Sequence, residues 1–199
     1  MNKILLLFGV IFLGTLILSC KDESHSNEEE NQDERKREKI INLVPEKKPI
    51  RLTYEQKSYV DACNAFSFNL FRQTTEAKGS RILSPLSAIY ALGMLNAGAD
   101  DETSKEIIDA LGFAGADRTS VNEYCLNLIE NSPKVDSGVH LKIANALFVN
   151  KDISLLQQYA QDMRDYYHAD IGSLDFSSST AADEINSWCS SRTDGMISE

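Results

Sequence analysis

The residues able to do chemistry in this chain are few and far apart. The only imidazoles are His25, His140 and His168. General acid–base or nucleophilic catalysis needs such a group beside a nucleophile, yet the chain has no GxSxG, Walker or HExxH motif. The acidic run 100–102 resembles a metal site, but carboxylates at a helix start are explained by the helix dipole. We therefore expect no enzyme, no metal site and no cofactor.

The cysteines fall into two kinds. Cys63, Cys125 and Cys189 each lie on the apolar side of a predicted helix, and no CxxC pair is present. Zinc binding is therefore poorly supported, and we expect three buried, free thiols. Cys20 instead lies at the boundary between an apolar segment and a charged one.

The segment before Cys20 is typical of an export signal. Residues 4–18 are almost wholly apolar, which is too short for a membrane span and suits a signal-peptide core. The motif Ile17-Leu18-Ser19-Cys20 resembles a bacterial lipobox, so we predict a signal peptide over residues 1–19 and lipidation of the Cys20 thiol. The alternative is a plain secretory signal. The next residues, 21–23, resemble the acidic surface-export signal of lipoproteins in Bacteroidetes-like bacteria, which predicts a membrane-anchored protein on the outer-membrane cell surface.

A charged segment follows, over residues 20–50. Sixteen of the thirty residues from Lys21 to Ile50 are charged and none is aromatic. Such a sequence cannot bury enough apolar surface to offset its ordering entropy, so we predict a disordered tether, stiffened at its end by Pro45 and Pro49. A solvated helix is the alternative for residues 35–43 only.

The remaining residues, 51–199, are predicted to form one folded domain. The whole chain has 199 residues, is 42% hydrophobic and has a formal net charge of −10. This composition supports a sizeable core. The chain has no basic stripe, so we expect no nucleic-acid partner.

Hydrophobic spacing predicts mostly helices in this domain. Residues 55–73 have helical periodicity, and a short strand at 82–83 leads to Ser84 as N-cap and Pro85 as first helical residue. Gly98 is placed to end that helix. Thr103 and Glu106 match a capping box for the next helix, which stops at Gly112.

The second half of the domain alternates between helices and strands. Thr119 or Ser120 is predicted to cap a helix with a clean apolar stripe, and residues 141–149 alternate as in a strand covered on both faces. A helix over 155–167, a short strand within 169–176 and a helix starting at 177–180 follow. Asn145 would be a buried amide that needs partners, for which we prefer a structural role.

Several segments, in order, resemble the N-terminal part of the serpin family. They are Phe66–Phe71, Leu83–Ile89, Ala91–Leu95, Gly98-Ala99, Leu111–Phe113, Ile143–Val149, Tyr167–Asp170, Asp175-Phe176, Ile185–Trp188 and Thr193–Ile197. One departure is Ser80, where the family usually has asparagine. The resemblance implies an incomplete α+β serpin fold: about six helices, strands of the central sheet and one strand of a second sheet.

The resemblance also implies a function. Serpins are suicide inhibitors of serine or cysteine proteases, which cleave an exposed reactive loop that then inserts into the central sheet. Ser84, Pro85 and Ser87 match the shutter region, beneath the point where the strands part. Asn145 and Asn186 match polar positions that we expect to be buried and structural.

The family's reactive loop lies near its C-terminus, beyond the segments matched here. We therefore expect this chain, as given, to lack inhibitory activity and to be a fragment, a truncated gene product or a remnant. The alternative function is a non-inhibitory surface lipoprotein that uses the serpin scaffold for binding.

Overall fold

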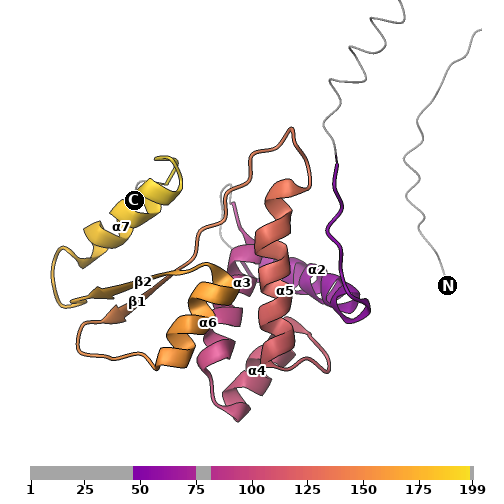
Figure 1. The fold of residues 1–199 in the computed structure, drawn as a ribbon, viewed down its shortest axis with the longest axis horizontal. Coiled ribbons are helices and arrows are strands. Elements are labelled where there is room, and N and C mark those ends of the chain that lie inside the picture. The colour runs from indigo at the N-terminus through magenta and orange to yellow at the C-terminus, as the bar shows by residue number, and fades with distance from the viewer. Residues whose placement is uncertain (1–46, 75–81, 198–199) are drawn as a thin grey trace, which may run out of the picture. The chain divides into compact units, whose positions relative to one another are not determined.

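The computed structural model describes residues 47–74 and 82–197 (Figure 1). The predicted signal peptide, Cys20, Ser80 and nearly all of the predicted tether lie outside these residues. The described residues belong to a single compact unit.

The described part of the chain contains six α-helices and two strands. They are α2 (Tyr54–Thr74), α3 (Pro85–Gly98), α4 (Asp101–Leu111), α5 (Arg118–Asn131), β1 (Ala146–Asn150), α6 (Gln157–Tyr167), β2 (Asp170–Leu174) and α7 (Ala181–Arg192), with a 3-10 turn, η1 (Ser132–Lys134), after α5. These elements confirm the predicted α+β class and the position of each predicted helix to within a few residues.

Aspartates cap two of the helices, where the sequence pattern favoured hydroxyl residues. Asp100 Oδ1 accepts from the backbone N–H of Thr103 at 2.8 Å, and Asp117 Oδ1 accepts from that of Ser120 at 2.7 Å. Thr103 and Ser120 are therefore third residues of their helices. The predicted cap Thr103 was wrong by three residues, and the predicted cap Thr119 or Ser120 was wrong by two or three. A carboxylate that accepts backbone N–H groups is favoured in its charged form, so the pKa of each aspartate is lowered.

The sheet is smaller than the sequence predicted. β1 and β2 pair in parallel, from Ala146 opposite Asp170 to Asn150 opposite Leu174, with α6 as the connection between them. Residues 141–145 are extended but form no ladder, and residues 82–83 are exposed and form no strand either. A strand needs a hydrogen-bonded neighbour, and the described residues provide one only for 146–150.

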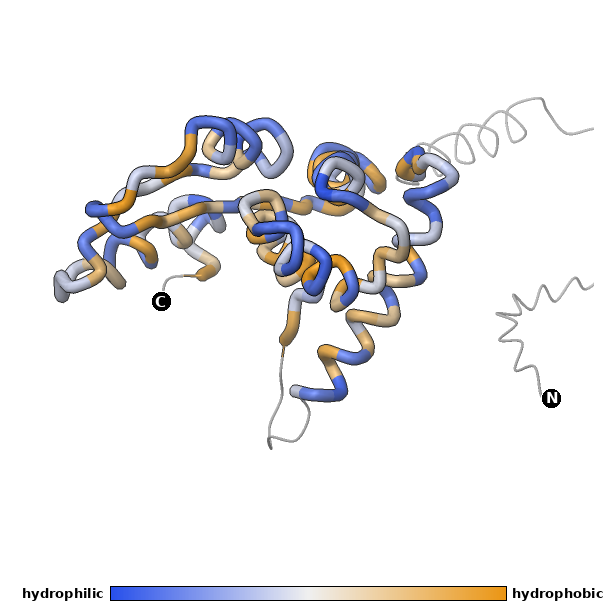
Figure 2. The backbone as a smooth tube through the Cα atoms, turned by 90° about the horizontal axis from the view of Figure 1, so that it is seen from below, coloured by the Kyte–Doolittle hydropathy of each residue, from blue (hydrophilic) through white to orange (hydrophobic). Residues whose placement is uncertain are grey.

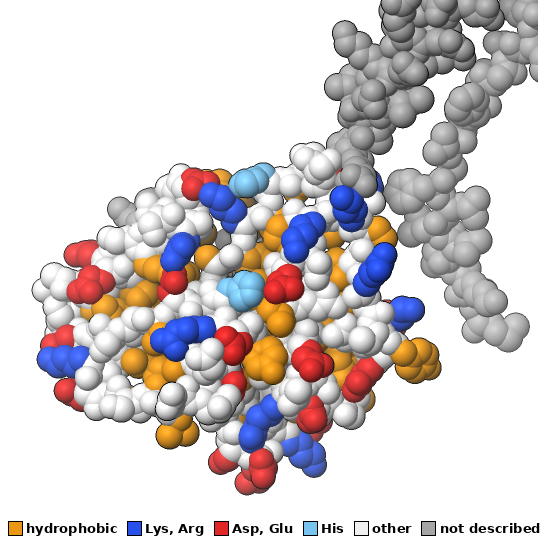
Figure 3. Space-filling view, viewed as in Figure 1, with side chains coloured by type: hydrophobic (Ala, Val, Ile, Leu, Met, Phe, Trp, Pro, Cys, Tyr) orange, Lys and Arg blue, Asp and Glu red, His pale blue; other side chains and the backbone are white. Residues whose placement is uncertain are grey.

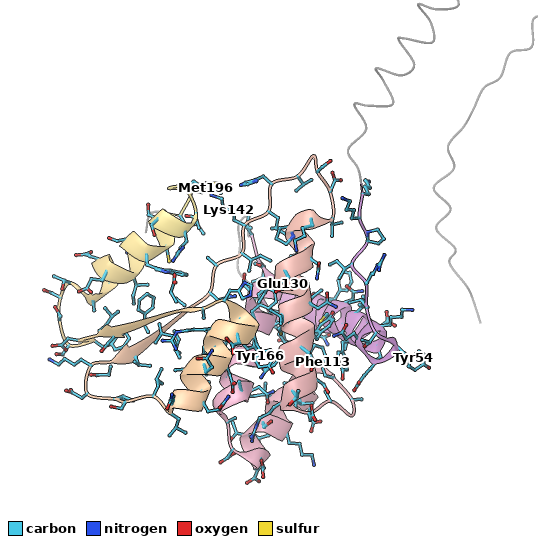
Figure 4. All side chains as sticks on the ribbon, viewed as in Figure 1. Tyr54, Phe113, Glu130, Lys142, Tyr166 and Met196 are labelled. Atoms are coloured by element: carbon cyan, nitrogen blue, oxygen red, sulfur yellow. The ribbon has the colours of Figure 1, made fainter. Side chains whose placement is uncertain are left out.

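The core lies among α2, α3, α4, α5 and α6. Its centre is an aromatic cluster in which the Tyr59 and Phe113 rings stack at 4.7 Å and both meet Tyr124 edge-on. All three side chains are buried. Figure 4 places Phe113 inside the helical body and Tyr54 at its outer end, while Figure 2 shows hydrophobic positions running through the middle of the described part. Burial and ring packing of this kind hold α2 and α5 together.

A second buried contact joins α3, α5 and α6. Tyr167 donates a hydrogen bond to Asn122 Oδ1 at 2.7 Å, and its hydroxyl lies 2.6 Å from the point that a Cβ atom on Gly93 would occupy. Only a glycine in α3 allows this approach.

Candidate functional site: the groove beside α3

The site begins at the first turn of α3. Ser84 has extended backbone angles and its Oγ accepts from the backbone N–H of Ser87 at 3.4 Å, while Pro85 occupies the first helical position. The two serine Oγ atoms are 2.8 Å apart, and both residues are exposed. Local capping therefore accounts for this serine pair without excluding a role in a larger sheet.

An apolar groove of about 640 Å³ runs beside this turn, and we call it the α3 groove. It lies between α3, the extended residues 140–148 and α7. Lining residues from the three walls include Ser87, Tyr90, Leu141, Ile143, Phe148 and Trp188. Figure 4 shows Lys142 and Met196, which also line the groove, close together at one end. Residues 141–144 of this wall form no strand ladder, and a groove beside such a segment is suited to accept further backbone.

α7 forms one wall of the α3 groove and is fastened to β2 by polar contacts. Trp188 Nε1 donates to Asp170 Oδ2 at 2.8 Å, and Arg192 pairs with the same carboxylate. The Trp188 ring also meets Phe148 edge-on, with centroids 5.9 Å apart. Lys142 and Asp194 form an ion pair that joins the extended segment to the turn after α7.

Acidification is expected to loosen α7 through Asp170. The hydrogen bond from Trp188 and the ion pair with Arg192 lower the pKa of Asp170. Because its folded pKa lies below the unfolded one, the stabilisation is present at neutral pH and is lost as the pH falls below about 4. Trp188 is the only tryptophan, so its fluorescence reports this change.

We expect an Asp170→Ala variant to show a red-shifted Trp188 emission already at neutral pH. The control is Asp152→Ala, which removes an equal charge from an exposed turn. Unchanged emission in the Asp170 variant would contradict a role for this carboxylate in holding α7.

The two asparagines singled out from sequence lie in different places. Asn145 lines the α3 groove, is half-buried, and donates from Nδ2 to the backbone oxygen of Tyr167 at 2.7 Å. Its own backbone oxygen accepts from the N–H of Asp170 at 3.0 Å, just before the β1–β2 ladder. Asn186 is half-buried on α7 and does not line the groove. The structural role of both amides stays a prediction.

Sequence reasoning therefore found one wall of the site and missed another. The structure places Ser84, Ser87 and Asn145 on one groove, with Pro85 in the first turn that shapes it. Sequence reasoning did not predict the contact between Asp170 and Trp188 or the ion pair between Lys142 and Asp194. No local motif marks these contacts, because each joins residues at least 18 positions apart.

The three described cysteines are free thiols. Cys125 is buried, and burial raises the pKa of its thiol to about 12. Cys63 and Cys189 are only half-buried, so the prediction of full burial was wrong for these two. A thiol with a raised pKa is mostly protonated at neutral pH and reacts slowly.

Two further properties concern residues 47–74 and 82–197. No group of three or more histidine, cysteine or acidic side chains is arranged to hold a metal there. Among the helices of this part, none combines the length and apolar sequence needed to cross a bilayer. Figure 3 shows acidic and basic side chains interspersed on the viewed face, which carries no continuous basic stripe.

Comparison with known proteins decides the family. The family model described as "Serpin (serine protease inhibitor)" matches residues 61–199. The chain belongs to the serpin family. Serpins are in general protease inhibitors and not enzymes, and the fold described above is an incomplete N-terminal serpin portion.

Similar serpins include proteins named as inhibitors and proteins named as binding globulins. The leukocyte elastase inhibitor of Xenopus tropicalis is 37% identical over 142 residues, which cover 69% of this chain and 37% of that protein. Thyroxine-binding globulin of Ovis aries is 35% identical over 139 residues, which cover 66% of this chain and 33% of that protein. The chain therefore spans about a third of the length of these relatives.

Solved structures agree with this serpin fold. The thermophilic serpin tengpin, in its latent state, superposes with a TM-score of 0.65 at 32% identity, over 76% of this chain and 40% of tengpin. Human thyroxine-binding globulin in complex with thyroxine gives a TM-score of 0.66 at 31% identity, over 72% of this chain and 40% of that globulin.

Proposed function

We propose that this chain is the N-terminal portion of a serpin that inhibits serine or cysteine endopeptidases through a reactive loop. The observation that carries the proposal is the serpin match over residues 61–199, together with relatives named as an elastase inhibitor and a serine protease inhibitor. In this proposal the reactive loop belongs to the C-terminal part of the complete protein.

The position of the α3 groove supports this proposal. In the proposed mechanism a protease cleaves the loop, which then inserts as a new strand into the central sheet and releases stored strain. β1 and β2 would belong to that sheet. Ser84 and Ser87 at the start of α3 would form part of the shutter beneath the parting strands, next to the extended residues 141–145.

A protease-complex assay tests the proposal. We expect the 199-residue chain, incubated with trypsin-like or papain-like proteases, to give no covalent complex on denaturing electrophoresis. The protein encoded when the reading frame is extended downstream of Glu199 to include the reactive loop is expected to give such a complex. A complex formed by the shorter chain would overturn the assignment of the loop to the C-terminal part.

A second function is a non-inhibitory binding role on the same scaffold. It is supported by relatives named corticosteroid-binding globulin and thyroxine-binding globulin. The hinge of the reactive loop distinguishes the two functions, because small residues there permit insertion and bulky or charged residues oppose it. A full-length protein with a bulky hinge and no protease complex would favour the binding role.

We also propose that the protein is an exported bacterial lipoprotein anchored through Cys20. The support is the apolar segment ending in the lipobox-like Ile17-Leu18-Ser19-Cys20. Cells grown with radioactive palmitate are expected to label the wild-type chain and a Cys63→Ala control but not a Cys20→Ala variant. Persistent labelling of the Cys20 variant would exclude this anchor.

A further inference from the structure

Residues 47–53, which we call the strap, are held against the end of α5 before the first helix begins. Lys47 forms an isolated antiparallel bridge with Asp136, and the backbone N–H of Lys48 donates to the backbone oxygen of Val135 at 2.7 Å. The strap therefore continues the charged N-terminal segment and fixes the place where that segment joins the folded unit.

An amide on α5 clamps the other end of the strap. Asn127 Nδ2 donates to the backbone oxygen of Arg51 at 2.9 Å and to Gln56 Oε1 at 3.0 Å. Gln56 and Thr53 in turn form a reciprocal capping box, with the two bonds measuring 3.2 and 3.1 Å. Asn127 thus ties the strap to the start of α2. Its loss would take this donor from the Arg51 carbonyl, while Gln56 Oε1 would keep its bond from the Thr53 backbone N–H.

The strap closes one side of a pocket of about 330 Å³. Ile50 and Leu52 of the strap line it together with apolar side chains of α2, α3 and α5. Cys63 and Tyr124 also line it, with the sulfur 3.6 Å from the hydroxyl oxygen. Cys63 is the thiol that a displaced strap would expose.

The helical core beneath the strap has its own contacts. The rings of Tyr59, Phe113 and Tyr124 pack on one another from α2, the turn after α4, and α5, without a strap residue between them. The strap itself is held by the Lys47–Asp136 bridge, the contacts of Lys48, the Asn127 bond to Arg51 and two half-buried apolar side chains. Segments held in this way open at lower free energy than the core to which they are attached.

We propose that the strap is a removable cover, which can leave the pocket between α2, α3 and α5 and expose Cys63 while the helical core stays folded. The device is independent of the reactive-loop function proposed above.

Cysteine alkylation in the full chain tests the proposal. Asn127→Asp removes both donated bonds but keeps the Oδ1 atom that accepts from Asn131. We expect iodoacetamide to modify Cys63 about tenfold faster in this variant. The closed strap loses roughly one hydrogen bond, so the free energy needed to open it is lower by about that amount. Cys125 and Cys189, quantified by mass spectrometry in the same sample, are expected to keep their wild-type rates.

Two further variants complete the experiment. Ile50→Ser, which removes an apolar anchor of the strap, is also expected to accelerate the alkylation of Cys63 and of no other described cysteine. Glu123→Gln, at an exposed position of α5, is the matched control and is expected to change none of the rates. An unchanged Cys63 rate in both strap variants, or an equal acceleration of all three cysteines, overturns the proposal, because the strap would then not open separately from the core.

Discussion

Replacing Phe113 by alanine is expected to destabilise the folded unit by about 3–5 kcal/mol, a loss comparable with the total stability of many domains. The Phe113 side chain is fully buried and contacts the rings of both Tyr59 and Tyr124. Its removal deletes the apolar contacts, leaves a cavity between α2 and α5, and removes two aromatic pairs at once.

Urea unfolding followed by far-UV circular dichroism measures this loss. Phe68→Ala is the matched control, because Phe68 lies on α2 with 70% of its surface exposed. The midpoint of the Phe113 variant should fall strongly, whereas that of the Phe68 variant should stay near the wild type. Equal shifts for the two variants would show that Phe113 does not lie at the centre of the core.

The helices of this serpin portion were predictable because their signal is local. The apolar stripe of α5, with Val121, Tyr124, Cys125 and Ile129 buried at helical spacing, identifies both the helix and its buried face. The helix starts were harder to predict. Asp100 and Asp117 precede other polar residues that can also cap a helix, and the choice depends on where the incoming chain turns.

The strands and the groove depend on partners that periodicity does not reveal. Alternation predicted a strand over 141–149, yet a ladder forms only at Ala146–Asn150, opposite β2. The serines of α3 were found through the family resemblance, whereas the fastening of α7 to Asp170 was not. Hydrogen bonds between side chains distant in sequence depend on the assembled fold, and no local pattern encodes them.

Tyr167 shows how the helical core positions the α3 groove. Its hydroxyl reaches Asn122 on α5, while its backbone oxygen accepts from the Asn145 side chain in the groove wall. Its ring lies against Gly93 on α3. A shift of this one residue is therefore transmitted both to the helix that carries Ser84 and Ser87 and to the segment that leads into β1.

Gly93→Val is expected to cause such a shift and to destabilise the folded unit by about 2–3 kcal/mol. The new Cβ would lie 2.6 Å from Tyr167 Oη and 3.2 Å from Cys125 Sγ, so α3 and α6 must move apart. Helix propensity slightly favours valine over glycine, so a loss of stability would come from packing.

Ala110→Val is the matched control, since it introduces the same β-branched side chain at an exposed helical position of α4 that does not line the α3 groove. Urea midpoints compare the stability of the two variants, and hydrogen exchange at the β1 amides reports the groove wall. We expect faster exchange at β1 only in the Gly93 variant, because displacement of Tyr167 weakens the bond from Asn145. A Gly93 variant as stable as the Ala110 control would show that α3 can retreat from Tyr167 without cost, and the close packing of α3 against α6 would then not determine the shape of the groove.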